Sequence, residues 1–206
     1  LPDAVTFAGA YDGGVVAAVS LIPDSPAGLP MDDIYHAELL GLRAQNRRIA
    51  EVTMLADRRL EIRRTLPMLL ALMKLLFDYA IMILECTDLC ITINPRHNDF
   101  YERYLLFTHL GDLKHYPSVQ NNPALARRLD LTRVRERCEG HELLLRLFFD
   151  ERTDREVFLN RFRMSDDDVA YFCNRTAIVD EASQPLFELV RDQYPELPFD
   201  RWRCKA

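Results

Sequence analysis

The sequence has few cysteines, and none of them stands in a metal-binding pattern. Five are present in 206 residues, with no CxxC pair and no histidine-rich spacing around them. This argues against a disulfide framework and against a structural zinc site, and an odd set of this kind fits the reducing cytosol. We therefore expect a cytoplasmic protein that holds no metal. The five are Cys86, Cys90, Cys138, Cys173 and Cys204.

An uninterrupted apolar run and an excess of positive charge are missing as well. The longest apolar stretch, residues 66–84, contains Lys74 and Asp78, so we expect a buried helix and no membrane span. The net charge of −6 and the pI of about 5.4 disfavour a nucleic-acid partner. The chain opens at Leu1 without a methionine or a basic leader, which we interpret as the truncated start of a longer protein.

Familiar catalytic motifs are also missing. The sequence contains no Gly-x-Ser-x-Gly elbow, no His-Glu-x-x-His pair, no phosphate-binding P-loop and no Rossmann fingerprint, and its five histidines are scattered. Serine hydrolases, zinc metalloenzymes and nucleotide hydrolases therefore have little support. What is present is a normal globular balance, with 49% hydrophobic and 28% charged residues, typical of one domain with at most a modest appendage.

The order of predicted elements indicates a mixed sheet. A hairpin with an Asp-Gly turn is predicted first, and residues 32–48 stay ambiguous. A strand, a long helix capped by Thr65, a second strand and an amphipathic helix then follow, and a βαβ unit of this kind places its two strands parallel. Weaker strand signals and, from about residue 143, several helices complete the chain. The predicted ranges are 5–10 and 15–22 for the hairpin, 49–56 and 89–93 for the parallel strands, 65–84 and 97–107 for the helices, and 116–119 and 124–131 for the weaker strands.

Basic side chains follow the first of the parallel strands. Residues 56–65 carry four arginines against Asp57 and Glu61, a local charge of +2 in an acidic chain, and contain no glycine. This segment leads into a helix N-terminus, where ligands of such sheets bind, so an anionic partner that docks through side chains is one interpretation. A solvated surface loop is the other. The arginines are Arg58, Arg59, Arg63 and Arg64.

Two further features are candidates for proton transfer. Glu51 is a lone carboxylate in an apolar strand, where burial would raise its pKa towards that of a general base; the alternative is an exposed strand edge or an ion pair with Arg47 or Arg48. His97 and Tyr101 lie four residues apart after the second parallel strand, so they share a helical face. A catalytic pair and a plain structural contact are equally compatible with that spacing.

Two blocks of sequence carry a family resemblance. The segments 37–56, with Ala37-Glu38-Leu39 and Ile49-Ala50-Glu51-Val52, and 94–111, with Asn94-Pro95-Arg96-His97 and Phe100-Tyr101, resemble the N-acyl amino acid synthase branch of the GNAT acyltransferases. This branch is related to acyl-homoserine-lactone autoinducer synthases and uses acyl-carrier-protein thioesters. The resemblance implies an α+β fold with a GNAT-like central mixed sheet, flanking helices and a C-terminal helical extension.

The resemblance also implies roles for individual residues. Glu51 matches the carboxylate that deprotonates the attacking amine, and the backbone of Val52, Thr53, Met54, Leu55 and Ala56 matches the strand that binds the pantetheine arm. Tyr101 lies near the place of the tyrosine that protonates the leaving thiolate, although its spacing to Phe107 is one residue longer than in the usual pattern. Independently of the resemblance, the position of His97 makes it a further catalytic candidate. Arg43 and Arg48 are candidates for holding a substrate carboxylate, or are structural partners of Glu38 or Glu51.

The expected acyl donor is inferred from a departure of this sequence from the GNAT pattern. Coenzyme A presents a pyrophosphate to a glycine-bearing loop, whereas this sequence has arginines there, which suit the phosphodiester and acidic surface of a carrier protein. We therefore expect no permanently bound cofactor, with the acyl-phosphopantetheine of an acyl carrier protein as donor in preference to acyl-CoA. The expected product is a long-chain N-acyl amino acid. An autoinducer-like or acyl-CoA-dependent N-acyltransferase and a non-catalytic acyl-carrier sensor remain as alternatives.

The predicted organisation has two parts. Residues 1–142 form the acyltransferase core, from which the N-terminal strand and helices of the family are expected to be missing, and residues 143–206 form a helical extension packed on that core. The extension has three open roles: covering the sheet, lengthening an acyl tunnel, or forming a homodimer.

Overall fold

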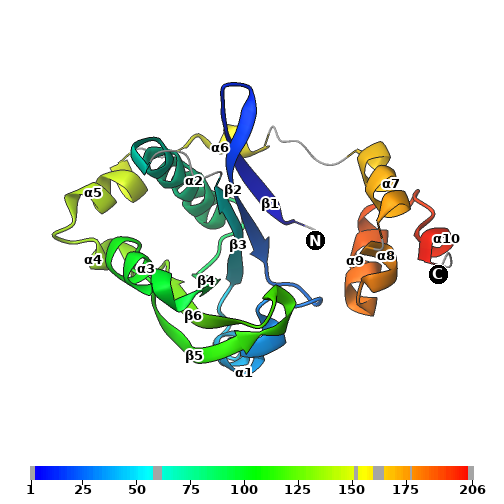
Figure 1. Cartoon of the computed structure of the whole chain (residues 1–206), viewed down its shortest axis with the longest axis horizontal. Coiled ribbons are helices and arrows are strands. Elements are labelled where there is room, and N and C mark those ends of the chain that lie inside the picture. Colours follow the sequence, from blue (N-terminus) through cyan, green and yellow to red (C-terminus); the bar gives the residue numbers. More distant parts are fainter. Residues whose placement is uncertain (1–2, 58–61, 151–152, 160–164, 177, 204–206) are drawn as a thin grey trace.

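The computed structural model describes residues 3–57, 62–150, 153–159, 165–176 and 178–203. Its centre is a six-stranded sheet in the order β1-β2-β3-β4-β6-β5 (Figure 1). Neighbouring strands are antiparallel except for β3 and β4, which are parallel. The strands are β1 (Val5–Tyr11), β2 (Gly14–Pro23), β3 (Ile49–Asp57), β4 (Asp88–Ile93), β5 (Thr108–Tyr116) and β6 (Asn122–Asp130). The mixed sheet with flanking helices that the resemblance implies is confirmed.

Helices cover both faces of this sheet. Helix α2 (Ile62–Met82) connects the two parallel strands and packs on one face, where Ala50, Val52 and Ile91 belong to the larger core. The opposite face is covered by α1 (Asp32–Arg43), under which Ile49 and Cys90 are buried. This alternation follows from the two-residue period of a strand. It assigns Glu51 to the α1 face, since Ala50 and Val52 on either side of it face α2.

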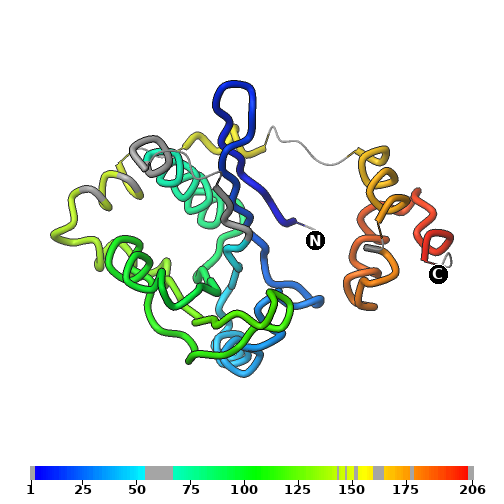
Figure 2. Tube along the Cα trace, in the orientation of Figure 1, coloured from blue at the N-terminus to red at the C-terminus, as the bar shows by residue number. Residues whose placement is uncertain are grey.

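The chain after the sheet forms two groups of helices. The first group contributes Val134, Leu144 and Phe158 to the core under α2 and consists of α4 (Val134–Arg137), α5 (Glu142–Leu145), the π-helical segment η3 (Arg146–Asp150) and α6 (Arg155–Leu159). The second group has a core of its own around Phe187 and Trp202, and Figures 1 and 2 show it to one side of the sheet. It consists of α7 (Asp166–Arg175), α8 (Ile178–Glu181), α9 (Gln184–Gln193) and α10 (Phe199–Arg203).

Most of the predicted elements are confirmed, and the errors fall on polar segments. The hairpin and the parallel pair lie where they were predicted, and the ambiguous residues 32–48 contain α1. Helix α2 begins at Ile62, so Thr65 is not its cap. The predicted helix 97–107 is the 3-10 turn η1 (Pro95–His97) followed by the short α3 (Asn98–Tyr104). The strand predicted at 116–119 is wrong: β5 ends at Tyr116, and the turn η2 (Pro117–Val119) follows. Because β5 is a mostly exposed edge strand, it lacks the apolar signal used to predict strands.

The two charges inside the apolar stretch of α2 pair with each other. The Lys74 ammonium lies 2.9 and 3.0 Å from the two carboxylate oxygens of Asp78, which also accepts a hydrogen bond from the backbone N–H of Thr153 at 2.9 Å. The pair thereby ties the segment before α6 to the middle of α2. Within the described ranges, no helix has both the length and the apolar character needed to cross a bilayer.

A buried ion network joins β3, β4 and β6 at one end. The carboxylate of Asp88, the first residue of β4, is fully buried and accepts hydrogen bonds from the guanidinium groups of Arg47, which precedes β3, and Arg128, on β6. Arg47 also binds Asp130 at 2.7 Å, which closes the network. Since each buried charge has a partner of opposite sign, the network fixes the three strands relative to one another.

We predict that Asp88→Ala is severely destabilising, because it leaves two guanidinium groups without their buried partner. The expected loss is about 3–5 kcal/mol in the free energy of unfolding, measured by urea denaturation. Arg48→Ala is the control, since the Arg48–Glu85 pair is 62% and 66% exposed and such pairs contribute under about 1 kcal/mol. Equal losses in the two variants would contradict a structural role for the network.

Gly111 on β5 allows α1 to approach the sheet. A Cβ atom at this position would lie 2.7 Å from Cδ1 of Tyr35, whose ring is fully buried. The ring cannot move away easily, because the Tyr35 hydroxyl lies 2.8 Å from the backbone oxygens of both Asp112 and Ala124. A side chain at position 111 would therefore push α1 off the sheet.

We predict that Gly111→Ala lowers the free energy of unfolding by about 1–3 kcal/mol through this overpacking. Gly41→Ala is the matched control, since Gly41 lies within α1 and a Cβ there meets nothing within 4 Å. It should raise stability by up to about 1 kcal/mol through helix propensity. Thermal unfolding of both variants tests the pair, and an unchanged midpoint for Gly111→Ala would contradict the close approach.

Candidate active site

The parallel strands β3 and β4 are paired over only part of their length. Their pairing starts at Ile49 and Asp88 and ends at Val52 and Ile91, although β3 continues to Asp57. On its other side β3 stays paired with β2 up to Asp57, with a bulge that opposes two residues of β3 to one of β2. The backbone of β3 beyond Val52 thus presents an edge towards β4 to which an extended ligand can add as a further strand.

This edge contains the backbone predicted to bind pantetheine. Thr53 follows the last β3–β4 pair directly, and the rest of the predicted segment continues along β3. The side chains of Met54, Leu55 and Ala56 lie outside the described ones, so only the course of their backbone bears on the prediction. The binding of pantetheine by these main-chain groups stays a prediction.

Glu51 lies one pair before the point of separation, and its carboxylate is buried. The residue is 2% exposed, and its Oε2 accepts a hydrogen bond of 2.8 Å from the backbone N–H of Met31, at the start of α1. Burial raises the pKa of Glu51 to about 7; the Met31 N–H lowers this pKa, and the negative charges of Asp32 and Asp33 add to the rise. A carboxyl group with such a pKa can accept a proton near neutral pH and release it again.

The alternative explanations for Glu51 are wrong. Arg47 binds Asp88 and Asp130, and Arg48 binds the exposed Glu85, so neither arginine pairs with Glu51. At Glu51 the strand is also no edge, because this residue is paired with β2 on one side and with β4 on the other. The carboxylate is thus held by a neutral backbone group, which leaves its affinity for a proton high.

Tyr101 lies on the other face of the sheet. It is 7% exposed and belongs to the core under α2. Its ring packs edge-on against the rings of Phe107 and Phe100, with centroid distances of 5.9 and 5.4 Å. Burial raises the pKa of the Tyr101 phenol to about 12, so it is a neutral donor at pH 7. Since Glu51 and Tyr101 face opposite sides, a single substrate can contact both only by passing between the separated strands.

His97 does not share the environment of Tyr101. It is the last residue of η1, its ring is exposed, and its Nε2 lies 2.9 Å from Nε of Arg96. The i, i+4 spacing predicts a common helical face only within one α-helix, whereas α3 starts at Asn98, after His97. The structure therefore does not join these two residues into a pair.

The predicted arginines have different outcomes. Arg58 and Arg59 lie outside the described residues, and so do the side chains of Arg63 and Arg64, so their role stays a prediction. The guanidinium of Arg43 makes four hydrogen bonds of 2.7 Å to the carboxylates of Asp24 and Asp32. This supports the structural alternative for Arg43, with partners other than those predicted.

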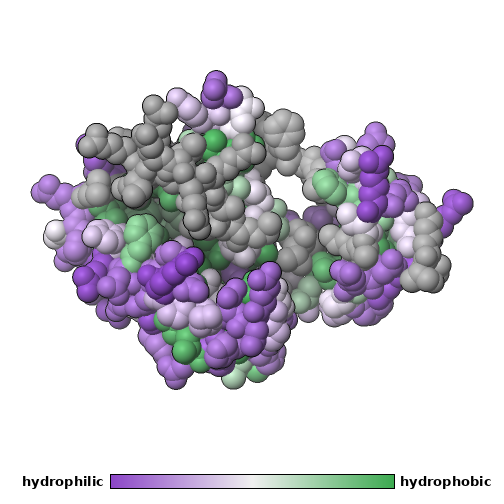
Figure 3. Space-filling model, in the orientation of Figure 1, coloured by the Kyte–Doolittle hydropathy of each residue, from purple (hydrophilic) through white to green (hydrophobic). Residues whose placement is uncertain are grey.

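Sequence reasoning missed several groups near Glu51. Met31 and Tyr116 are far from it in sequence, and no motif marks them. Thr92 follows the last β3–β4 pair on β4, and its hydroxyl is one of two buried polar side-chain atoms without a hydrogen-bond partner in the described part of the chain; the other is Oε2 of Glu38. An unpartnered hydroxyl at the point of separation is a polar contact open to a ligand. On the face shown in Figure 3, apolar side chains are seen in the sheet domain, with hydrophilic residues below them.

No group of three or more histidine, cysteine, aspartate or glutamate side chains in the described ranges is arranged to hold a metal ion.

We predict that Glu51→Gln stabilises the protein at alkaline pH. A carboxyl group whose folded pKa is about 7, against an ordinary value of 4.5, favours folding below pH 4.5, and this contribution is lost as the pH rises through 7. Relative to wild type, the variant should gain up to about 3 kcal/mol at pH 8 and nothing at pH 4. Urea denaturation at both pH values measures the difference.

The exposed Glu85→Gln is the control, and its difference from wild type should be small at both pH values. A Glu51→Gln difference that does not change between pH 4 and pH 8 would show that the carboxyl group titrates normally in the folded protein.

Comparison with known proteins places this chain in a family. The family model described as N-acyl amino acid synthase FeeM matches residues 1–130. The solved structure of FeeM, an N-acyl amino acid synthase from uncultured soil microbes, is 35% identical, has a TM-score of 0.58, and the match covers 66% of this chain and 76% of that one. No curated protein matches the sequence.

Other solved structures are more distant. BjaI, a CoA-dependent acyl-homoserine lactone synthase solved with SAM and isopentyl-CoA, is 18% identical with a TM-score of 0.44, and the match covers 66% of this chain and 64% of that one. An acyl-CoA N-acyltransferase from Pseudomonas aeruginosa is 13% identical with a TM-score of 0.41, and covers 62% and 69%. Because the family model spans more than half of the sequence, the chain belongs to the N-acyl amino acid synthase family of FeeM and is an N-acyltransferase.

Proposed function

We propose that this N-acyltransferase moves a long-chain acyl group from the thioester of an acyl carrier protein to the amine of an amino acid. The observation that carries the proposal is the buried carboxyl group of Glu51, whose pKa is raised to about 7, one residue pair before the strands β3 and β4 separate. A proton acceptor at this place in an N-acyl amino acid synthase family member is suited to activating the attacking amine.

In the proposed reaction the thioester lies between the separated strands. The backbone beyond Val52 binds the pantetheine arm, and its N–H groups polarise the thioester carbonyl. The amine approaches from the α1 face and transfers its proton to Glu51 as its nitrogen bonds to the carbonyl carbon. The carbon–sulfur bond breaks towards the α2 face, where Tyr101 protonates the thiolate. The products are an N-acyl amino acid and the free thiol of the carrier.

The choice of donor rests on charge. Four arginines and no glycine lie between β3 and α2, or at the start of α2, in a protein whose net charge is −6. Arginine side chains are well suited to bind a phosphodiester and an acidic protein surface. They are a poor substitute for the glycine-bearing loop that binds a pyrophosphate. We therefore propose the acyl-phosphopantetheine of a carrier protein as the donor, with acyl-CoA a poorer substrate.

The acceptor is held by a cationic side chain in this proposal. Arg48 is the better candidate for the substrate carboxylate, because its partner Glu85 is exposed, whereas Arg43 is engaged with two half-buried carboxylates.

The described cysteines are free thiols, which suits a reaction in the cytoplasm. The homodimer stays a prediction.

The test is to incubate the full-length protein with a long-chain acyl carrier protein and a pool of the common amino acids. We expect a new N-acyl amino acid, detected by mass spectrometry, whose mass identifies both substrates. Glu51→Gln should lower kcat by about a hundredfold or more, because the amine then has to lose its proton without a positioned base. Glu136→Gln, which alters an exposed carboxylate paired with Arg133, should keep the wild-type rate.

Each part of the proposal has its own contradicting result. Full turnover by Glu51→Gln would remove that residue from the mechanism. Equal use of acyl-CoA and the acylated carrier would contradict the argument from the arginines. Retention of the carrier on the protein without any product would indicate a sensor of acylated carrier in place of an enzyme.

A further inference from the structure

The peptide bond between Pro30 and Met31 is hydrogen-bonded at both of its polar ends. Its N–H, on Met31, donates to Oε2 of Glu51 at 2.8 Å, and its carbonyl oxygen, on Pro30, accepts from the hydroxyl of Tyr116 at 2.6 Å. Glu51 and Tyr116 are 2% and 8% exposed, so water competes little for either bond. Because a peptide unit is planar and conjugated, the two bonds act on one rigid dipole.

Donation to the carbonyl of an amide strengthens its N–H as a donor. Chains of hydrogen bonds polarise one another, and the effect is largest where the surroundings exclude water. Here the chain runs from the Tyr116 hydroxyl through the peptide to the carboxylate of Glu51. It favours the ionised carboxylate, since an N–H group donates more strongly to a charged oxygen than to a neutral one.

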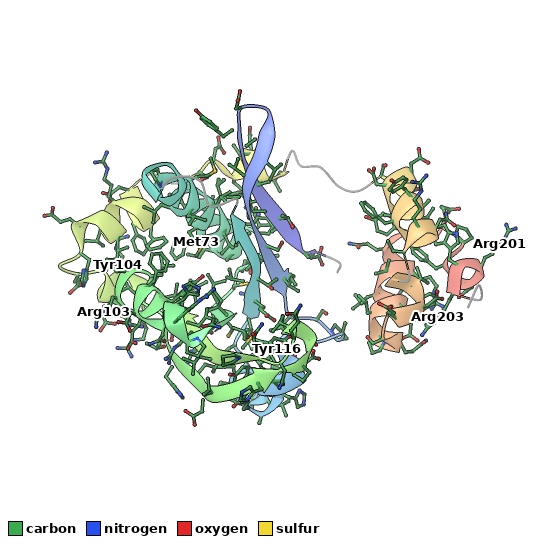
Figure 4. All side chains as sticks on the ribbon, viewed as in Figure 1. Met73, Arg103, Tyr104, Tyr116, Arg201 and Arg203 are labelled. Carbon is green, nitrogen blue, oxygen red and sulfur yellow. The ribbon has the colours of Figure 1, made fainter. Side chains whose placement is uncertain are left out.

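We propose that Tyr116 is a positioning residue for Glu51: through the Pro30–Met31 peptide it fixes the carboxylate and strengthens the hydrogen bond that favours its ionised form. The inference rests on the proposed function for its catalytic meaning, whereas the effect on the carboxylate exists whether or not the protein turns over substrate. Tyr116 lies at the end of the edge strand β5, and Figure 4 marks it near the chain that leads from β2 to α1.

Titratable groups from α1, β4 and β5 lie near Glu51, whereas its register partner on β2 is the uncharged Ile22. From α1, the charges of Asp32 and Asp33 raise its pKa, as burial does. From β4, Cys90 is opposite Glu51 in the register, and burial raises the pKa of that thiol, which keeps it uncharged. From β5, burial, Glu51 and Asp33 raise the pKa of Tyr116 to about 12. Against these groups, the Met31 N–H lowers the pKa of Glu51, so this bond opposes the effects that favour the protonated form.

The peptide is held in place from other sides as well. Leu29 N–H donates to Asp32 at 2.7 Å, and the Ser118 hydroxyl lies 3.0 Å from a carboxylate oxygen of Asp33. Loss of the Tyr116 hydroxyl therefore removes one polarising bond and leaves the loop attached. This separation makes the proposal testable by removing a single oxygen atom.

The test compares Tyr116→Phe with Tyr35→Phe in the full-length protein. Tyr35 is the matched control because its buried hydroxyl also lies 2.8 Å from backbone carbonyls, those of Asp112 and Ala124, neither of which belongs to the peptide that contacts Glu51. The titration of Glu51 is followed by NMR of ¹³C-labelled glutamate carboxyl groups, with the Glu51 signal assigned by its disappearance in Glu51→Gln. The acid limb of kcat/KM is measured on the same proteins.

We expect the Glu51 titration midpoint of Tyr116→Phe to rise by roughly half a pH unit to one pH unit, which is about a threefold to tenfold change in proton affinity. The acid limb of kcat/KM should move by the same amount, so that the loss of rate is largest near pH 6 and shrinks by pH 9. Tyr35→Phe should lower thermal stability without moving either quantity.

Two results separate this inference from the proposed function. An unchanged Glu51 midpoint in Tyr116→Phe, or an equal shift in Tyr35→Phe, overturns the positioning role. A shifted midpoint with an acid limb that does not follow it supports the action of Tyr116 on Glu51 and instead removes Glu51 as the catalytic base.

Discussion

The buried carboxylate of Asp88 is the contact on which the geometry of the sheet depends. It binds one arginine that precedes β3 and another on β6, and thereby holds three strands together at one end. Parallel pairing of β3 and β4 starts there and lasts for four residue pairs. With that end closed, the strands can separate at the other end without loss of the fold. Glu51 is in the third pair, close enough to the network to be fixed and close enough to the separation to meet a ligand.

The separation also explains how acid–base groups on opposite faces of a sheet can act on one substrate. Strand alternation directs Glu51 towards α1, and Tyr101 belongs to the core under α2. In a continuous sheet the backbone would lie between them. Where β3 and β4 are no longer paired, the thioester can occupy the space of the missing hydrogen bonds, with the amine on one side and the leaving sulfur on the other. Burial of Glu51 lowers the free energy of unfolding at neutral pH. The same burial gives the carboxyl group a pKa at which it can exchange protons at neutral pH.

The sequence predicts the parts of this arrangement that depend on local pattern. The two parallel strands are continuously apolar, and Glu51 stands out because it interrupts one of them. Helix α1 and strand β5 carry many polar side chains, so neither periodicity nor propensity identifies them well. Met31 and Tyr116 could not be found at all, since they are 20 and 65 residues from Glu51 and act through backbone groups that leave no mark in a sequence. Arg43 was placed near the site, but its partners depend on how the loop after β2 folds back.

The difference between Glu51 and Asp32 explains why the hydrogen-bond partner of the proposed base is a peptide N–H group and not an arginine. Both are partly or fully withdrawn from water, which raises the pKa of each, but Asp32 also accepts hydrogen bonds from Arg43, and its pKa is lowered to about 2. A carboxylate with that pKa stays ionised and takes no proton from an amine at neutral pH. The neutral Met31 N–H orients Glu51 and offsets only part of the burial effect, which leaves the pKa at about 7. Arg43 can therefore secure the loop through Asp24 and Asp32 without touching Glu51, and the reactive carboxylate keeps its basicity because its own contact carries no charge.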